Sequence, residues 1–163
     1  KVRQLMPDAG ISTDIIVGSP GETDAQFRNT LKLITELRFD KVHVATYSER
    51  PGTFAARFQL DDVSPAEKHD RLQTIEDTQR KISLEINQNF RGQMVEVLVE
   101  HSKSGKTPNE NRLTGRTRSN KLVHFNAPAG ATQIGMMVKV KITTTGAWSL
   151  QGEQITSPVN SRH

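Results

Sequence analysis

A basic string in the last third of the chain holds the residues best suited to bind another molecule. Its candidate RNA-binding residues are Arg112, Arg116, Arg118, Asn120, Lys121, His124 and Phe125. Alternation along a strand would place the three arginines on one face, where they could neutralise phosphates. The asparagine could reach base edges, and the phenylalanine could stack on a base. The other interpretation is a solvated cationic face with the phenylalanine in a hydrophobic core.

The charge distribution favours nucleic acid as the partner of this string. Residues 1–91 carry 13 Lys and Arg against 14 Asp and Glu, a net charge of −1. Residues 92–163 carry 9 against 4, a net charge of +5. All of the excess positive charge therefore lies in the part that contains the basic string. This asymmetry is expected if only that part meets a polyanion.

A second candidate site is the turn Gly18-Ser19-Pro20-Gly21-Glu22-Thr23. It follows a β-branched run, residues 13–17, that predicts a buried strand. It leads into a capping box, residues 23–26, that predicts the start of a helix. In parallel α/β folds, ligands bind where loop amides and helix N-termini meet at the carboxyl ends of strands. From the turn alone, a ligand site and an ordinary tight turn are equally good interpretations.

The remaining motifs exclude several kinds of chemistry. The sequence has no cysteine, so these residues form no disulfide and hold no cysteine-ligated iron–sulfur cluster. The histidines without metal-ligand spacing are His43, His69, His101, His124 and His163. The segment Ser104-Gly105-Lys106-Thr107 is similar to a phosphate-binding loop, but Glu100 stands where that motif needs a glycine. No apolar run approaches the roughly 18 residues that span a bilayer, which excludes a membrane protein.

The glycine-rich turn is positioned by a predicted strand–helix–strand unit. Apolar residues between Phe27 and Leu37 follow helical spacing, and residues 42–47 predict a second strand. The short links between these elements demand a parallel sheet. One such unit cannot bury its own sheet edges, and Lys1 is not an initiator Met, so we expect a piece of a longer protein. A second capping box, residues 64–67, and apolar residues spaced three and four apart predict a helix from 65 to about 89.

The basic string is positioned by a different kind of structure. From Gly92 onward, alternating residues predict strands at 93–100, 112–118, 122–125, 135–144 and 147–154, the last two forming a hairpin around Thr145-Gly146. Several short strands in one stretch suggest a small closed barrel. The sequence therefore predicts two domains: residues 1–91, with the strand–helix–strand unit and the long helix, and residues 92–158, with the barrel.

Three stretches resemble the radical-SAM methylthiotransferases. Residues 10–23 are similar to the fifth-strand segment of that family, although Ser19 stands where Phe is usual. The segment Tyr47-Ser48-Glu49-Arg50-Pro51-Gly52-Thr53 resembles the sixth-strand signature, with Glu49 where Pro is commoner. Residues 115–125 resemble the core of the TRAM domain, an OB-like RNA-binding barrel. The resemblance implies an α/β plus all-β fold: the C-terminal portion of a parallel radical-SAM (TIM-like) barrel, a linking helix and a small TRAM β-barrel.

The resemblance also implies an activity. The Arg-Pro-Gly-Thr turn and the basic TRAM strand are most similar to the MiaB branch, which adds a methylthio group to isopentenyl-adenosine beside the tRNA anticodon. Members of the family use S-adenosyl-L-methionine and two [4Fe-4S] clusters, one to cleave that cofactor to a 5′-deoxyadenosyl radical and one to deliver sulfur. By match of position, the residues near S-adenosyl-L-methionine would be Asp14, Ile16, Gly18, Tyr47 and Ser48. The cluster-binding cysteines would lie upstream of Lys1, so these residues alone would be inactive.

The expected partners are the anticodon stem-loop of tRNA and a cluster-bearing N-terminal portion of the same protein, both in the cytoplasm. Two alternatives stay open: a methylthiotransferase acting on threonylcarbamoyl-adenosine, and a non-catalytic TRAM-type RNA-binding protein. The second predicts salt-sensitive RNA binding by residues 92–163 alone. At the strand ends, Ile16 could instead fill a barrel core and Tyr47 could be a core aromatic.

Overall fold

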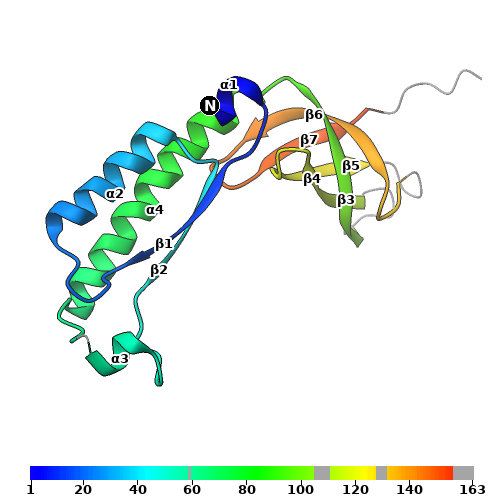
Figure 1. Cartoon of the computed structure of the whole chain (residues 1–163). Coiled ribbons are helices and arrows are strands. Elements are labelled where there is room, and N and C mark those ends of the chain that lie inside the picture. The colour runs from blue at the N-terminus through cyan, green and yellow to red at the C-terminus, as the bar shows by residue number, and fades with distance from the viewer. Residues whose placement is uncertain (59, 105–110, 128–131, 156–163) are drawn as a thin grey trace, which may run out of the picture. The chain divides into compact units, whose positions relative to one another are not determined.

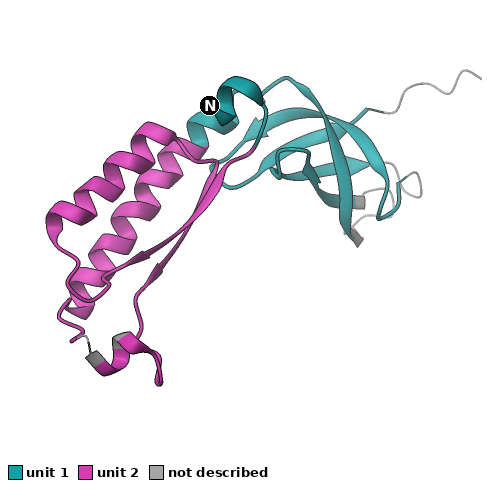
Figure 2. Cartoon of the chain, viewed as in Figure 1, with its two compact units in different colours: residues 1–9, 84–163 teal, residues 10–83 magenta. Residues whose placement is uncertain are grey.

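The computed structural model describes residues 1–58, 60–104, 111–127 and 132–155. The segment similar to a phosphate-binding loop, residues 104–107, falls outside this part from residue 105 onward, as do the last three residues of the second predicted domain. Two compact units divide the chain, one made of Lys1–Ala9 and Leu84–His163 and the other of Gly10–Ser83 (Figure 2). Each unit has its own sheet, and each is described by itself.

The unit formed by Gly10–Ser83 is built on the expected parallel strand pair. Strands β1 (Ser12–Val17) and β2 (Lys41–Thr46) pair in parallel over their whole length, and helix α2 (Asp24–Leu37) connects them. Helix α4 (Pro65–Gln88) runs beside α2 along the strands (Figure 1). The strand–helix–strand prediction is therefore confirmed, as is the long helix. A short helix, α3 (Phe54–Phe58), was not predicted.

Local sequence explains why α2 starts and stops where it does. The hydroxyl of Thr23 accepts a hydrogen bond from the amide of Gln26, and the Gln26 side chain accepts one from the amide of Thr23, which is the predicted capping box. The helix ends at Arg38, whose backbone is left-handed with φ 49°. Immediately afterwards, Asp40 bonds the backbone of Ile11, which fixes the start of β2 beside the start of β1.

The strand pair has one covered face and one open face. Val17 and Val42 are buried on the side of the helices, together with Ile34 of α2 and Ile75 of α4. On the other side, Ile16 leaves 60% of its surface exposed. The exposed residues that share this open face are Ser12, Asp14, Ile16, Lys41, His43 and Ala45. A two-stranded sheet with one open face has room for further protein or a ligand against it.

The buried stripe of α4 is more polar than its sequence pattern suggests. The buried residues on it are Lys68, Arg71, Ile75, Gln79, Ile82, Ser83 and Asn87. Gln79 donates to the carbonyl of Phe39, and Ser83 donates to the carbonyl of Asp40, so these side chains hold the link between α2 and β2. Backbone carbonyls thus accept from the donors of Gln79 and Ser83, while the side-chain oxygens of Gln79 and Asn87 are buried without a partner among the described residues.

The other unit is the predicted small barrel, which is confirmed. Its strands are β3 (Met94–Ser104), β4 (Asn111–Thr117), β5 (Leu122–Ala127), β6 (Met137–Thr145) and β7 (Leu150–Gln154). They close in the order β3-β4-β5-β7-β6, with β5 and β7 parallel and the other pairs antiparallel. A short helix, α1 (Val2–Leu5), belongs to the same unit. The turn between β6 and β7 spans residues 146–149, so the second strand of the predicted hairpin starts later than expected.

Alternate residues of every strand fill the barrel. The largest buried side chains in it include Leu113, Phe125, Ile142 and Leu150. Two glycines let neighbouring strands approach. A Cβ atom on Gly115 would stand within 3.0 Å of the carbonyl oxygen of Leu98, and one on Gly152 would stand equally close to that of Lys141. The barrel therefore depends on glycine at both positions.

Candidate functional site

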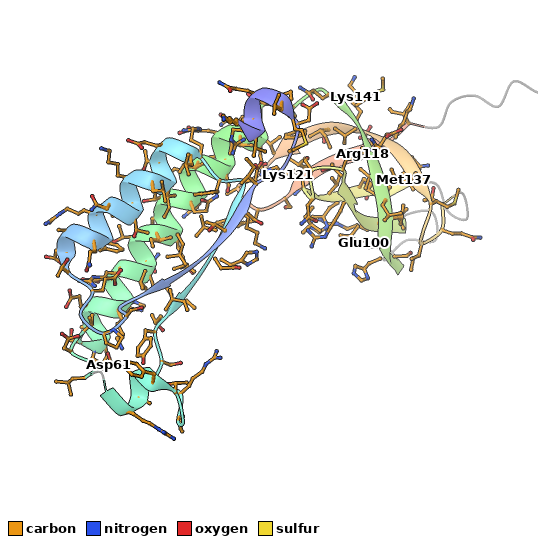
Figure 3. All side chains as sticks on the ribbon, viewed as in Figure 1. Asp61, Glu100, Arg118, Lys121, Met137 and Lys141 are labelled. Carbon is orange, nitrogen blue, oxygen red and sulfur yellow. The ribbon has the colours of Figure 1, made fainter. Side chains whose placement is uncertain are left out.

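The outer face of β4 presents the arginines of the basic string. Leu113 and Gly115 of this strand point into the barrel, so Arg112 and Arg116 point outward. Arg118 does not share that face as predicted, because β4 ends at Thr117 and Arg118 stands in the following turn with 89% of its side chain exposed. Glu100, Arg118 and Lys121 are labelled in Figure 3, with side chains drawn as sticks on the barrel ribbon. Arg112 and Arg116 on β4 and Arg118 in the β4–β5 turn therefore form a cationic edge.

Arg116 is held in a defined orientation. Its Nε atom lies 3.3 Å from a carboxylate oxygen of Glu100. Its Nη1 atom donates to both the carbonyl oxygen of Asn120, at 3.2 Å, and the side-chain oxygen of Asn120, at 3.1 Å. Asn120 can supply both acceptors because its backbone is left-handed, with φ 62°, a conformation that asparagine adopts more readily than most residues. By contrast, Arg118 makes only a loose ion pair, 3.8 Å from Glu96.

Two residues of the predicted RNA site do not face solvent. Phe125 is 2% exposed and packs among the core residues of the barrel, so the prediction that it stacks on a base is wrong. Lys121 is also largely buried, with 8% exposed, and its amide donates to the hydroxyl of Thr117. His124 is on the outer face of β5, where its Nδ1 atom lies 3.0 Å from the hydroxyl of Thr114. Alternation explains the contrast, because His124 and Phe125 are neighbours on one strand and must face opposite sides.

Sequence reasoning missed a second group of outward-facing cations. Lys139 and Lys141 of β6 are exposed, and in register they stand opposite Glu96 and Met94 of β3. Figure 3 labels Lys141 and Met137 on this strand. The signal was present in the sequence, since Val138, Val140 and Ile142 alternate with these lysines and fill the barrel. The cationic surface of the barrel thus extends beyond the predicted string.

The carboxyl ends of β1 and β2 form the other candidate site. Gly18 has a left-handed backbone, with φ 71°, and its amide donates to a carboxylate oxygen of Glu22 at 2.5 Å. The amide of Tyr47 donates to the carbonyl of Val17 at 2.8 Å, which ties the two strand ends together. Beside them is an open cavity of about 380 Å³. The residues that line it are Thr46, Tyr47, Pro65, Lys68 and His69.

The predicted cofactor-binding residues do not all lie together. Gly18 and Tyr47 meet at the cavity end of the strands, where the side chain of Lys68 touches both. Asp14 and Ile16 lie on the open face of β1, opposite His43 and Ala45 of β2. Ser48 follows β2 and is exposed.

Sequence reasoning also missed two buried cations on α4, Lys68 and Arg71. Arg71 is 4% exposed and bonds the carboxylates of Glu22, Asp24 and Glu67, with its guanidinium 5.4 Å from the ring of Phe27. Burial opposes its charge, but hydrogen bonds to Glu22 and Asp24 raise the pKa of Arg71 above its ordinary value. It therefore stays a cation while buried. Neither residue stood out in the sequence, because their contacts with Tyr47 and Glu22 join positions 21 and 49 residues apart.

Two further observations limit the chemistry of the described residues. Among them, no group of three or more acidic, histidine or cysteine side chains is arranged to hold a metal ion. None of the helices in the described part is both long enough and apolar enough to cross a bilayer.

Comparison with known protein families agrees with the closed barrel described above. The family model of the TRAM domain matches residues 88–155, the span of the barrel. Residues 88–155 are a TRAM domain. The prediction of that domain from residues 115–125 is therefore confirmed.

Relatives match almost the whole chain. It is 46% identical over 99% of its length to the tRNA-2-methylthio-N(6)-dimethylallyladenosine synthase of Chloroflexus aurantiacus. It is 47% identical over 95% of its length to the protein of that name from Thermoanaerobacter sp. strain X514, and 43% over 98% to that from Bacillus thuringiensis. These alignments cover 34%, 32% and 30% of the relatives, so the chain spans about a third of their length. The resemblance to the methylthiotransferases is confirmed.

Proposed function

We infer that this chain is part of a tRNA-2-methylthio-N(6)-dimethylallyladenosine synthase. The observation that carries the inference is similarity along nearly its whole length, at 43–47% identity, to proteins of that name. The same matches favour the dimethylallyl branch over the threonylcarbamoyl branch. In this proposal the barrel holds tRNA, and the strand ends of residues 10–83 form one wall of the radical-SAM barrel. The substrate then puts the protein in the cytoplasm, where tRNA is modified.

The RNA-binding part of the proposal rests on the cationic outer face of the TRAM domain. The orientation of Arg116 supports a defined contact with a phosphate or a base edge, because an arginine fixed by its neighbours loses less entropy on binding. Arg112 and Arg118 are suited to phosphates of the anticodon stem-loop, and Asn120 and His124 stand beside them. Phe125 and Lys121 are not among the residues proposed to contact RNA, because both are buried.

The cofactor-binding part rests on the open face and carboxyl ends of β1 and β2. The residues present suit S-adenosyl-L-methionine: the cavity lies at the strand ends, and the adjacent open face offers an exposed apolar side chain, Ile16, beside the carboxylate of Asp14. Gly18, Tyr47 and Ser48 would border the same ligand. When bound, the cofactor supplies radical chemistry. The residues of this chain would bind and orient it.

The two [4Fe-4S] clusters of this enzyme class do not fit the residues of this chain, because the sequence has no cysteine. The proposal therefore requires a cluster-bearing portion of the same protein, and no chemical step through a cluster is assigned to the residues described.

A chimera tests the proposal. The chain replaces the segment of the Chloroflexus aurantiacus synthase that aligns with it, and the purified chimera is assayed for methylthiolation of tRNA carrying N(6)-dimethylallyladenosine. We expect activity on this tRNA and none on tRNA carrying threonylcarbamoyladenosine. The parent synthase is the positive control. A chimera that folds, holds its clusters and binds tRNA but transfers no methylthio group would contradict the proposal.

A further inference from the structure

Lys68 of α4 is buried directly beneath the glycine-rich turn. It is 7% exposed, and its aliphatic chain occupies the space in which a side chain of residue 18 would stand: a Cβ atom on Gly18 would come within 3.0 Å of Lys68 Cγ. Gly18 is thus required for space as well as for its left-handed backbone. The lysine and the turn fit each other closely.

The ammonium group of Lys68 reaches across to the other strand end. It lies 2.6 and 2.7 Å from the two carboxylate oxygens of Asp61, which is labelled in Figure 3. It also donates to the carbonyl oxygen of Tyr47 at 3.4 Å and stands 5.1 Å from the centre of the Tyr47 ring. One side chain therefore contacts the residues that directly follow β1 and β2, Gly18 and Tyr47.

Arg71, one turn further along α4, holds the same turn from its other end. It bonds both the carbonyl and the carboxylate of Glu22, and that carboxylate accepts from the amide of Gly18. The amide of Gly21 is bonded by Asp62, the neighbour of Asp61. The turn is thus clamped between α4 and the segment that precedes it.

Stability alone does not account for a buried lysine here. Replacing a buried ion pair by apolar side chains of similar volume is often neutral or stabilising, because desolvation costs about as much as the pair gains. The charged group of Lys68 instead fixes the positions of the carbonyl and ring of Tyr47 relative to Gly18. Tyr47 and Lys68 both line the open cavity at the strand ends, and Gly18 lies against the aliphatic chain of Lys68.

We propose that Lys68 is a positioning residue that sets the geometry of Tyr47 and Gly18 for the ligand bound at the carboxyl ends of β1 and β2. The proposal rests on the proposed function, which places S-adenosyl-L-methionine there. Lys68 acts through its neighbours and not on the reacting atoms. Its removal therefore weakens ligand binding and leaves the rate of the bound complex unchanged.

The first test uses the chain by itself. Tyr47 is the only tyrosine in the sequence, so ¹³C-tyrosine labelling gives one set of ring signals in an NMR spectrum. We expect Lys68→Met to shift these signals in a chain that still folds, with a lower unfolding temperature because Asp61 loses its ion-pair partner. Lys32→Met is the matched control, because Lys32 makes an exposed pair with Glu36 at 3.8 Å on α2. Unshifted Tyr47 signals in a folded Lys68→Met chain would overturn the proposal.

The second test uses the chimera with the Chloroflexus aurantiacus synthase. We expect Lys68→Met to raise the KM for S-adenosyl-L-methionine about tenfold, the effect of losing a hydrogen bond from a charged group, with kcat unchanged. Lys32→Met should leave both constants unchanged. An inactive parent chimera would count against the proposed function, while the NMR test would still decide the role of Lys68. An active chimera whose KM ignores Lys68→Met would overturn the positioning role alone.

Discussion

Alanine at either barrel glycine should destabilise the TRAM domain strongly. The added methyl group would stand within 3.0 Å of a backbone carbonyl oxygen, that of Leu98 for Gly115→Ala and that of Lys141 for Gly152→Ala. A carbonyl in a strand ladder cannot rotate away, so the strands must separate. Overpacking of this kind costs about 1–3 kcal/mol, and we expect the upper end here. In a domain of this size, about 3 kcal/mol lowers the Tm by roughly 12–24 °C.

Thermal unfolding is monitored by calorimetry and by the fluorescence of Trp148. Trp148 is the only tryptophan in the sequence and lies in the β6–β7 turn. Gly146→Ala in that turn is the matched control, since its Cβ atom would stand 3.3 Å from the carbonyl of Ser149 and needs only a small adjustment. We expect the control to change the Tm by a few degrees at most. If Gly115→Ala and Gly152→Ala behaved like the control, the strand spacing of the closed barrel would be wrong.

Two further predictions concern the outer and inner faces of the barrel. Phe125→Ala should lower the unfolding free energy by about 3–5 kcal/mol, because it leaves a cavity in the barrel core. His124→Ala, on the same strand, should lower it far less. Equal losses of stability in chemical denaturation would contradict the burial of Phe125. Glu100→Gln should tighten RNA binding about fivefold, since removing a carboxylate beside Arg116 relieves about 1 kcal/mol of repulsion toward a phosphate. Glu36→Gln on α2 is the charge-matched control. Unchanged affinity for Glu100→Gln would mean that RNA does not approach Arg116.

Local patterns predicted most of the secondary structure. The capping box at Thr23 and the alternation of β3 to β7 depend on residues close in sequence, and both appear in the structure. Element ends were less predictable. Arg118 was assigned to a strand, but the left-handed backbone of Asn120 turns the chain and ends β4 at Thr117. A period of two fixes which residues share a face but not which face is buried, and this is why Phe125 was assigned to the RNA surface.

The clamp at the strand ends could not be predicted because the contacts of Lys68 and Arg71 with the strand ends join residues that are distant in sequence. Arg71 bonds Glu22, which lies 49 positions earlier, and Lys68 bonds Tyr47, which lies 21 positions earlier. In the sequence both cations look like ordinary residues of an exposed helix face. Only the packing of α4 against the glycine-rich turn gives them their buried positions.

The most direct test of the account is the salt dependence of RNA binding by the whole chain. The probe is an RNA stem-loop with the sequence of a tRNA anticodon arm, and its Kd is measured across a series of salt concentrations. We expect binding that weakens steeply with salt, because phosphate contacts release counterions. Arg116→Ala and Arg118→Ala should each flatten the slope of log Kd against log salt by about one unit. Lys32→Ala on α2 should leave the slope unchanged. RNA binding that is absent, that ignores salt, or that is indifferent to both arginines would contradict the assignment of this face to tRNA.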